Sequence, residues 1–414
     1  CFGTGYPTDT GAFQVNFGGP FSGNYYLMVD MCLSKYNQDG SELIYATYLG
    51  GNAEDLPHSM IANEQDQIVL LGSSNSTNYP VSTGAYDQTH NGGKDIVITS
   101  LSSDGSQLIG STYIGGSGLD GVNGIEEYYA DDYRGEVVLD TSGNIYIASF
   151  TKSANFPATA GSFQDSLSGG QDGVICKLTP SLDTLIWATM IGGSLDDAAF
   201  ALKLDQDENV FVAGVTKSST YPMAGNSAFG TYLGGQTDAF VSKLSPDGAQ
   251  LLASSFYGTA SGDQNFFVEL DQDGAVYLFG TTAGTIAATT GKYVGPSDGA
   301  YVYKTTSDLD TIEWVTTFGD LAPAAFLVDN CNRIYISGQG ATATVLNINN
   351  FDTLDPVNNL VQAGFYLMKL SPDAASLEFG SFYGNSGSHV DGGTSRFDKR
   401  GVVYQATCSN GVFP

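Results

Sequence analysis

Carboxylates recur at one position of a repeated segment, and their type and spacing could do chemistry. An Asp follows the glycines that end a predicted strand at four matching places, namely Asp55, Asp120, Asp197 and Asp263. Ca²⁺ takes several oxygen ligands, so a partial ring of these side chains would suit a cation or a small ligand. Alternatively, each Asp accepts backbone N–H bonds and holds its own loop, as in many turns. We favour this structural alternative because the Asp recurs in copy after copy.

A second candidate site is the insertion GVNGIEEYYADDYRG at residues 121–135, which breaks the repeat length. Tyr-rich acidic loops on a rigid scaffold are suited to recognition, although a simple solvated loop has the same composition. The residues that we predict to contact a ligand or partner are Tyr128, Tyr129, Asp131, Asp132 and Tyr133.

The sequence offers little for catalysis. His58 and His389 fall in segments predicted to be loops between repeats, and neither has a nearby Cys or a carboxylate at metal-ligand spacing. There is no HExxH helix or Walker loop. The DQD segments at 205–207 and 271–273 lack the twelve-residue Ca²⁺ pattern, and we expect hairpin turns there. We therefore predict no catalytic residue and no required cofactor, with Ca²⁺ as the candidate ion.

Charge and composition exclude several partners. The 414 residues carry 15 Lys+Arg against 44 Asp+Glu, a net charge of −29. Nucleic-acid binding needs clustered cations, and anionic membranes disfavour an acidic surface. No stretch reaches the ~18 apolar residues of a membrane helix, so we expect no direct membrane insertion. Acidity of this kind suits a protein outside the cell that meets salt or divalent cations.

Internal repeats determine which elements must hold these residues. One half-unit reads VVLDTSGNIYIASFTKSANFP at 137–157 and LKLDQDENVFVAGVTKSSTYP at 202–222, and another reads DAFVSKLSPDGAQLLASSFYG at 238–258. Apolar and polar residues alternate with a period of two, and SG, DG or DEN sits between the runs, so each half-unit is a β-hairpin. Six copies of each half-unit predict an all-β fold, a six-bladed β-propeller of four-stranded antiparallel blades.

The two ends of the chain supply complementary half-units. We predict that they join into one blade that closes the ring without a free edge. The predicted blades are 385–414 with 1–51, then 52–116, 117–193, 194–258, 259–319 and 320–384. Cys1 and Cys408 would lie at equivalent positions near this seam, as a disulfide or as two free thiols. We expect Cys32 and Cys176 to be small buried residues and Cys331 to be a free thiol.

The strings STYIGGSGLDG, DTSGNIYIASFTKSANFPATAGSFQ and DAFVSKLSPDG resemble the bacterial SBBP β-propeller repeat over nearly the whole chain. The segment HVDGGTSRFDKRGVVYQATC is similar to versions in large Bacteroidetes surface proteins. The resemblance implies an extracellular module of a longer polypeptide, exported by the type IX route and associated with adhesion. Residues 285–296 and 341–361 depart from the FP-T-GAF loop of the other copies.

Three functions remain open at this stage. The first is a non-catalytic interaction or structural module of a surface adhesin or appendage. Its partners would be other domains of the same polypeptide, neighbouring copies, or cell-surface glycans or proteins. The second is a lectin-like propeller that stacks sugars on the tyrosines of the insertion. The third is a polysaccharide hydrolase or lyase, which needs paired carboxylates or a His–Tyr set that converge on one site.

Overall fold

The computed structural model describes residues 4–19, 29–125, 131–340, 365–383, 396–397 and 403–404. Over these residues the elements are β-strands apart from the 3₁₀ helix η1 (Asp131–Tyr133). No helix in this part of the chain is long and apolar enough to cross a membrane. The chain divides into two compact units, Cys1–Gly124 with Asp132–Ile191 and Ile125–Asp131 with Gly192–Pro414, and each is described by itself.

The first unit holds one two-stranded and two four-stranded antiparallel sheets, whose strands neighbour one another in chain order. The two-stranded sheet is β1 (Met31–Tyr36) and β2 (Leu43–Leu49). The next sheet is β3 (Asp55–Ala62), β4 (Ile68–Ser74), β5 (Asp95–Leu101) and β6 (Leu108–Ile114). The last is β7 (Glu136–Leu139), β8 (Ile145–Thr151), β9 (Asp172–Leu178) and β10 (Leu185–Ile191).

The second unit holds three four-stranded sheets and a short hairpin. Its first sheet is β11 (Asp197–Leu204), β12 (Val210–Thr216), β13 (Asp238–Leu244) and β14 (Leu251–Tyr257). Its second is β15 (Asp263–Leu270), β16 (Val276–Thr282), β17 (Gly299–Thr305) and β18 (Ile312–Thr317). Its third is β19 (Ala322–Val328), β20 (Ile334–Gln339), β21 (Phe365–Leu370) and β22 (Leu377–Tyr383), and the hairpin is β23 (Arg396–Phe397) with β24 (Val403–Tyr404).

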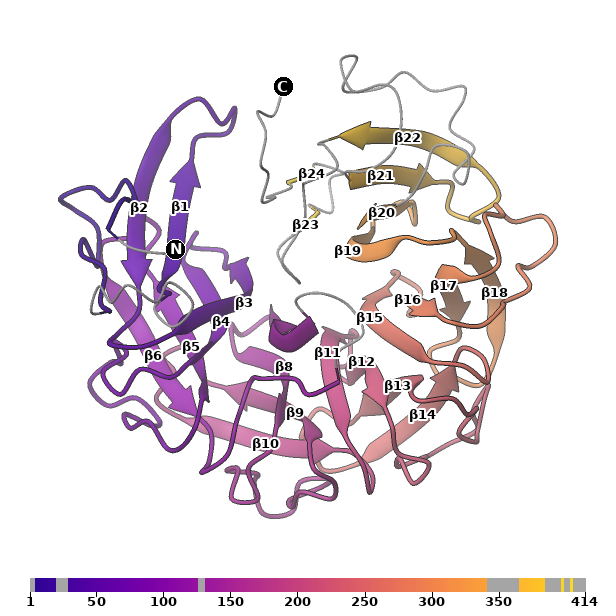
Figure 1. Ribbon diagram of the computed structural model, residues 1–414, viewed down its shortest axis with the longest axis horizontal. Helices are drawn as coiled ribbons and strands as arrows, with labels where there is room; N and C mark the ends of the chain where they lie inside the picture. The colour runs from indigo at the N-terminus through magenta and orange to yellow at the C-terminus, as the bar shows by residue number, and fades with distance from the viewer. Residues whose placement is uncertain are drawn as a thin grey trace. The chain divides into compact units, whose positions relative to one another are not determined.

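The predicted fold class is confirmed: the chain is all-β, a six-bladed β-propeller of four-stranded antiparallel blades. Each four-stranded sheet is one blade, in which four consecutive strands lie in sequence order (Figure 1). The two half-blades predicted from the ends are present as the two-stranded sheets β1–β2 and β23–β24. Their union into one closing blade stays a prediction.

Within each unit, successive blades pack face to face through apolar side chains, and strands such as β5 and β8 are buried along their whole length. In the first unit, Ile96 and Ile98 of β5 pack in one cluster with Ile145 and Ile147 of β8. In the second unit, Phe279 of β16 lies 5.4 Å from Phe326 of β19, measured between ring centres. Burying an apolar side chain contributes about 1.5–3 kcal/mol, so these faces are the main stabilising contacts of the fold.

The loop predicted as FP-T-GAF covers the edge of the fourth strand in the described blades that end at β6, β10, β14 and β18. In the β7–β10 blade, Met190 N–H donates to Gln164 O at 2.9 Å and Thr159 N–H donates to Ala188 O at 2.9 Å. The departing segment 285–296 does the same for β18, since Thr289 N–H donates to Val315 O at 2.9 Å. An unpaired edge strand invites pairing with another chain, and these loops blunt that edge.

The same loops also reach the next blade. Tyr86 N–H donates to Leu182 O at 3.0 Å, in the turn between β9 and β10. Tyr293 N–H donates to Ala374 O at 2.7 Å in the turn between β21 and β22. Leu182 and Ala374 have positive φ values of 58° and 54°, which directs their carbonyls to the incoming loop. Each such loop therefore ties one blade to its neighbour.

Candidate functional site

The four predicted carboxylates lie at matching positions where the first strand of a blade begins. Asp55, Asp197 and Asp263 are the first residues of β3, β11 and β15, and Asp120 bridges to Thr151 ahead of β7. All four are fully buried. Each faces a Ser or Thr on the neighbouring strand, at Ser74, Thr216, Thr282 and Thr151.

Hydrogen-bond donors fill the space around these carboxylates. Asp120 Oδ2 accepts Gly116 N–H at 2.7 Å and Ser153 Oγ–H at 2.8 Å, and Thr151 Oγ1–H donates to Oδ1. Equivalent bonds join Asp55 to Gly51 and Ser76, Asp197 to Gly193 and Ser218, and Asp263 to Thr259. The carboxylates therefore hold the loop between two blades, which is the structural alternative.

These contacts bear on the Ca²⁺ hypothesis. A cation needs several oxygen ligands, whereas N–H and O–H groups surround Asp120. Among the described residues, no group of three or more His, Cys, Asp or Glu side chains could hold a metal ion. Binding of Ca²⁺ at Asp55, Asp120, Asp197 or Asp263 stays a proposal, and the described residues offer no group of three such ligands to support it.

Sequence reasoning missed a second row of carboxylates. Asp95, Asp172 and Asp238 are the first residues of β5, β9 and β13, and they are fully buried. In register they lie opposite the same hydroxyl residues as the first row, for example Asp55↔Ser74↔Asp95. The signal was available, because the second half-units begin with Asp in DIVIT, DGVIC and DAFVS.

Burial raises the pKa values of several carboxyl groups in both rows. In the first row the pKa is raised to about 6 for Asp55 and about 7 for Asp263, while hydrogen bonds to the ionised form oppose the shift. In the second row burial raises the pKa to about 7 for Asp95 and about 6 for Asp238. The negative charge of Asp120 adds to the shift of Asp95.

A corner of the first unit gathers a histidine, a tyrosine and a lysine. His58 was predicted to lie in a loop, which is wrong: it belongs to β3 and is fully buried, because the strand starts at Asp55. Its Nε2 is 3.0 Å from Ser73 Oγ, and burial together with Lys94 lowers its pKa to about 3. Its ring centre lies 5.9 Å from that of Tyr133. His389 lies outside the described residues.

Lys94 completes this corner. Its Nζ lies 5.0 Å from the centre of the Tyr133 ring and pairs with Glu54 Oε2 at 2.6 Å. Tyr133 is half-buried, whereas Lys94 is 4% exposed. The structure thus brings Tyr133, one of the predicted contact residues, next to a neutral imidazole and a cation.

The other residues of the insertion contribute less. Tyr128 and Tyr129 lie outside the described residues, and of Asp131 only the backbone, in η1, is described. Asp132 is half-buried, and its backbone carbonyl accepts Asn123 N–H at 3.0 Å. Contact between a ligand and these residues stays a prediction.

The DQD segments are hairpin turns, as predicted. Asp205 Oδ1 accepts the N–H groups of Asp207 at 3.0 Å and Asn209 at 2.8 Å, which closes the turn between β11 and β12. Its Oδ2 pairs with Lys243 at 3.4 Å. The β15–β18 blade repeats this arrangement, with Asp271 paired to Lys304 at 3.3 Å.

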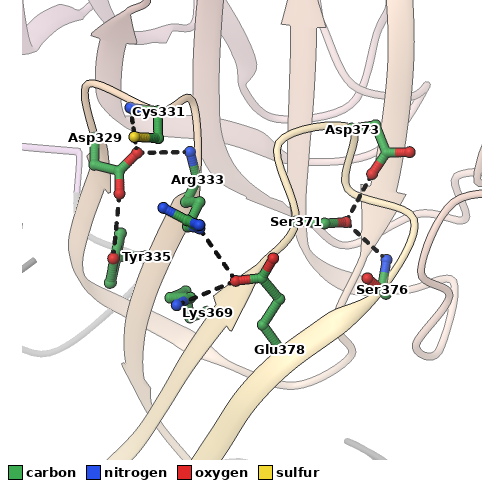
Figure 2. Close-up of polar contacts among 9 residues, drawn as sticks. All are labelled: Asp329, Cys331, Arg333, Tyr335, Lys369, Ser371, Asp373, Ser376 and Glu378. Carbon is green, nitrogen blue, oxygen red and sulfur yellow. Dashed lines mark hydrogen bonds and ion pairs between the residues drawn. The ribbon is translucent and has the colours of Figure 1, made fainter.

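The blade β19–β22 varies this arrangement. Figure 2 shows Asp329 accepting the N–H groups of Cys331 and Arg333, both at 2.8 Å, and the Tyr335 hydroxyl at 3.2 Å. Lys369 turns instead to Glu378, at 3.1 Å, which it shares with Arg333 (Figure 2). Backbone N–H donors to Asp329 thus hold the turn, although the lysine of this blade pairs with a different acid.

A cavity of 450 Å³ lies in the second unit between the first turns of its three four-stranded blades. Gln206 Nε2–H donates to Gln272 O at 3.2 Å across two of these turns. The charged residues that line the cavity are Lys203, Asp205, Asp207, Lys243, Glu269, Asp271, Asp273 and Asp329. Acidic residues dominate this lining, so the cavity suits a partner that brings cations or hydrogen-bond donors.

The cysteines differ from expectation at one position. Cys32 is disulfide-bonded and half-buried, so its interpretation as a small buried thiol is wrong. Cys176 is a buried free thiol and Cys331 an exposed free thiol, as expected. Cys1 and Cys408 lie outside the described residues.

Comparisons with known proteins give fold similarity only. No family model matches the sequence, and no curated protein matches it. A protein of unknown function from Dyadobacter fermentans DSM 18053 is 13% identical, with 83% of this chain and 88% of that chain covered and a TM-score of 0.43. An ulvan lyase is 11% identical, with 91% and 84% covered and a TM-score of 0.44. An exo-β-1,3-galactanase from Clostridium thermocellum is 13% identical, with 86% and 65% covered and a TM-score of 0.31.

Proposed function

We propose that this chain is a non-catalytic extracellular interaction module of a larger bacterial surface protein. The observation that carries the proposal is that the recurring carboxylates are committed to structure. Asp120 is fully buried and accepts bonds from Gly116, Ser153 and Thr151, whereas a catalytic acid or base must reach its substrate. Function then falls to the surface of the blades and their turns.

Further features support an extracellular module. Cys32 is disulfide-bonded, and disulfides persist mainly in oxidising compartments outside the cytosol. The net charge of −29 favours solubility in salt. The resemblance to SBBP repeats supports a Bacteroidetes surface protein that is exported by the type IX route and takes part in adhesion. Its partners would be other parts of the same polypeptide, neighbouring copies, or surface glycans and proteins.

The acidic cavity of the second unit is the contact surface we propose to test. Asp207 and Asp273 are exposed on two of its turns. The chain would be applied to arrays of glycans and assayed for self-association, beside the double variant Asp207→Asn/Asp273→Asn. We expect binding without any cleaved product, and at least a tenfold weaker affinity in the variant, about 1.4 kcal/mol.

The control is the double variant Glu64→Gln/Asp66→Asn, which removes two exposed acids from the equivalent turn between β3 and β4. This variant should bind like the unchanged chain. Equal losses in both variants would exclude the cavity as the contact surface. Release of shortened or unsaturated saccharides would contradict the non-catalytic proposal itself.

A second candidate is a polysaccharide lyase, and the corner of His58, Tyr133 and Lys94 favours it. Abstraction of the proton beside a uronate needs a general base and a group that offsets the developing charge. Tyr133 would be the base, while the neutral His58 and the Lys94 cation lie 5.9 and 5.0 Å from its ring centre. Against this candidate, His58 is only 1% exposed, so a substrate could not contact its ring directly.

Ultraviolet absorbance of unsaturated uronates during incubation with polyuronates tests the lyase. The substitution Tyr133→Phe should lower the rate of product formation at least a hundredfold. Tyr86→Phe, at a tyrosine that is 37% exposed elsewhere in the first unit, is the control. No product from the unchanged chain on any polyuronate would rule out this candidate.

A further inference from the structure

Two buried carboxyl groups meet where the β3–β6 blade passes into the β7–β10 blade. A methyl group placed on Gly115 would come within 2.4 Å of Asp95 Oδ1 and 2.8 Å of Asp120 Oδ2. Both oxygens therefore lie against the same glycine. Only glycine at this position leaves room for both carboxyl groups.

The two groups receive unequal numbers of hydrogen bonds. Asp120 accepts from Gly116, Ser153 and Thr151. Asp95 Oδ2 accepts Asn91 N–H at 2.6 Å, but its Oδ1 is buried without a hydrogen-bond donor. A buried carboxylate oxygen without a donor is costly, whereas a protonated one can itself donate.

Ser74 explains the inequality. It stands between Asp55 and Asp95 in register, and its hydroxyl donates to Asp55 Oδ1. Its oxygen accepts Ser76 N–H at 3.0 Å. The hydroxyl proton is thus used on the Asp55 side and is not available to Asp95.

We propose that Asp95 and Asp120 form a carboxylic acid–carboxylate pair that holds one proton and makes this blade junction sensitive to pH. Asp120 is the ionised member, because three donors stabilise its negative charge. Asp95 carries the proton on Oδ1, the atom that faces Asp120 across Gly115. The pair links two consecutive blades, so loss of the proton places two like charges at the junction.

The other charges near Asp95 do not offset that repulsion. Asp87 and Asp120 both raise the pKa of Asp95, and Tyr113 on β6 is a neutral neighbour. The Lys94 ammonium, although adjacent in sequence, pairs with Glu54 at 2.6 Å. Like-charge repulsion therefore acts in the same direction as burial.

In the second unit, Asp238 and Asp263 are a related pair of buried carboxyl groups. Asp238 is fully buried, its Oδ2 accepts Leu233 N–H, and its Oδ1 has no hydrogen-bond donor. Its charge contributes to the raised pKa of Asp263. Neighbouring buried carboxyl groups thus occur in both units.

The direction of the pH effect follows from linkage. The folded pKa of Asp95 is raised to about 7 from 3.8, so its contribution favours the closed junction fully in acid. That contribution is lost as pH rises through about 7. Junctions with such pairs should therefore open more readily in mildly alkaline solution than in mildly acidic solution.

Hydrogen exchange of the whole chain, followed by mass spectrometry and corrected for intrinsic rates, tests the proposal. Between about pH 5 and pH 8 the protection of residues 91–95 and 115–120 should fall about tenfold. The variant Asp95→Asn mimics the protonated acid, and its protection should stay nearly constant. Asp66→Asn, at an exposed turn residue of the same blade, should behave like the unchanged chain.

Protection that does not change with pH in the unchanged chain would overturn the proposal, and so would an equal fall in Asp95→Asn. If Asp95→Asn does not fold, the aspartate ¹³Cγ resonances of the unchanged chain give the answer. Buried aspartates that titrate near pH 7 are expected from the pair. Aspartates that are all ionised by about pH 5 would exclude it. These outcomes do not depend on which partner the module binds.

Discussion

Two junctions between consecutive blades differ in the side chains that lie at equivalent positions. At the junction between β6 and β7, Asp95 and Asp120 pack around Gly115. At the junction between β18 and β19, Gly299 and Leu321 occupy the positions where the β3–β6 and β11–β14 blades have Asp. The first junction therefore depends on carboxyl side chains, and the second has none at these positions.

Backbone contacts hold the second junction without carboxylates, and the first junction has a matching parallel bridge between Lys94 and Leu119. Gly299 and Gly319 form a parallel bridge, and Ala300 N–H donates to Gly319 O at 2.7 Å. Phe318 N–H donates to Ala300 O at 2.8 Å. Neutral backbone groups do not titrate, so only the carboxylate junction should respond to pH. The comparison shows that closure of consecutive blades does not itself require Asp.

The largest effect should come from breaking the backbone junction with Gly299→Ala. Gly299 has φ of 82°, and a methyl group there would lie 2.1 Å from Gly319 O. We expect a loss of about 3–4 kcal/mol in the free energy of unfolding, measured by denaturant titration. Gly291→Ala has the same φ of 82° with nothing within 4 Å, so it should cost only about 1 kcal/mol. Similar losses in the two variants would show that the close approach does not matter.

The next effect should come from breaking the carboxylate junction with Asp120→Ala. The substitution leaves the buried donors of Gly116, Ser153 and Thr151 without their acceptor, and we expect a loss of about 3 kcal/mol. Asp95→Ala removes the acceptor of Asn91 alone and should cost about 1 kcal/mol near neutral pH. Denaturant titration of both variants checks the order, and a larger loss for Asp95→Ala would contradict our account of the donors.

A smaller effect separates the two junctions without any substitution. Raising the pH from about 5 to about 8 should lower the free energy of opening of residues 115–120 by about 1–2 kcal/mol, because the folded pKa of Asp95 is raised to about 7. Residues 317–321 should not change. Hydrogen exchange resolves the two segments in one experiment, and a parallel change in both would mean that the pH dependence arises elsewhere.

The smallest effect should follow removal of divalent cations. Because donors surround Asp120, we expect EDTA or added Ca²⁺ to shift the free energy of unfolding by less than about 0.5 kcal/mol. Thermal unfolding in the two conditions measures this shift. An increase of several degrees with Ca²⁺ would revive the four first-row carboxylates as a cation site.

The sequence by itself determined the all-β fold, the blade repeat and the structural use of the recurring Asp residues. Strand alternation and turn residues are local signals, and repetition of Asp55, Asp120, Asp197 and Asp263 indicated a need shared by every blade. The hairpin turns at 205–207 and 271–273 were predictable for the same reason, since Asp bonds to its own turn.

Only the tertiary structure decided which carboxyl groups meet and which donors they receive. Asp95 and Asp120 are 25 residues apart, and Thr151 and Ser153, at the end of β8 and just after it, reach Asp120 across some thirty residues of sequence. His58 is a buried strand residue because β3 begins at Asp55. The FP-T-GAF loops bond to the edges of fourth strands, a contact that the sequence did not predict. Such contacts depend on packing between distant segments, which no local pattern of residue types encodes.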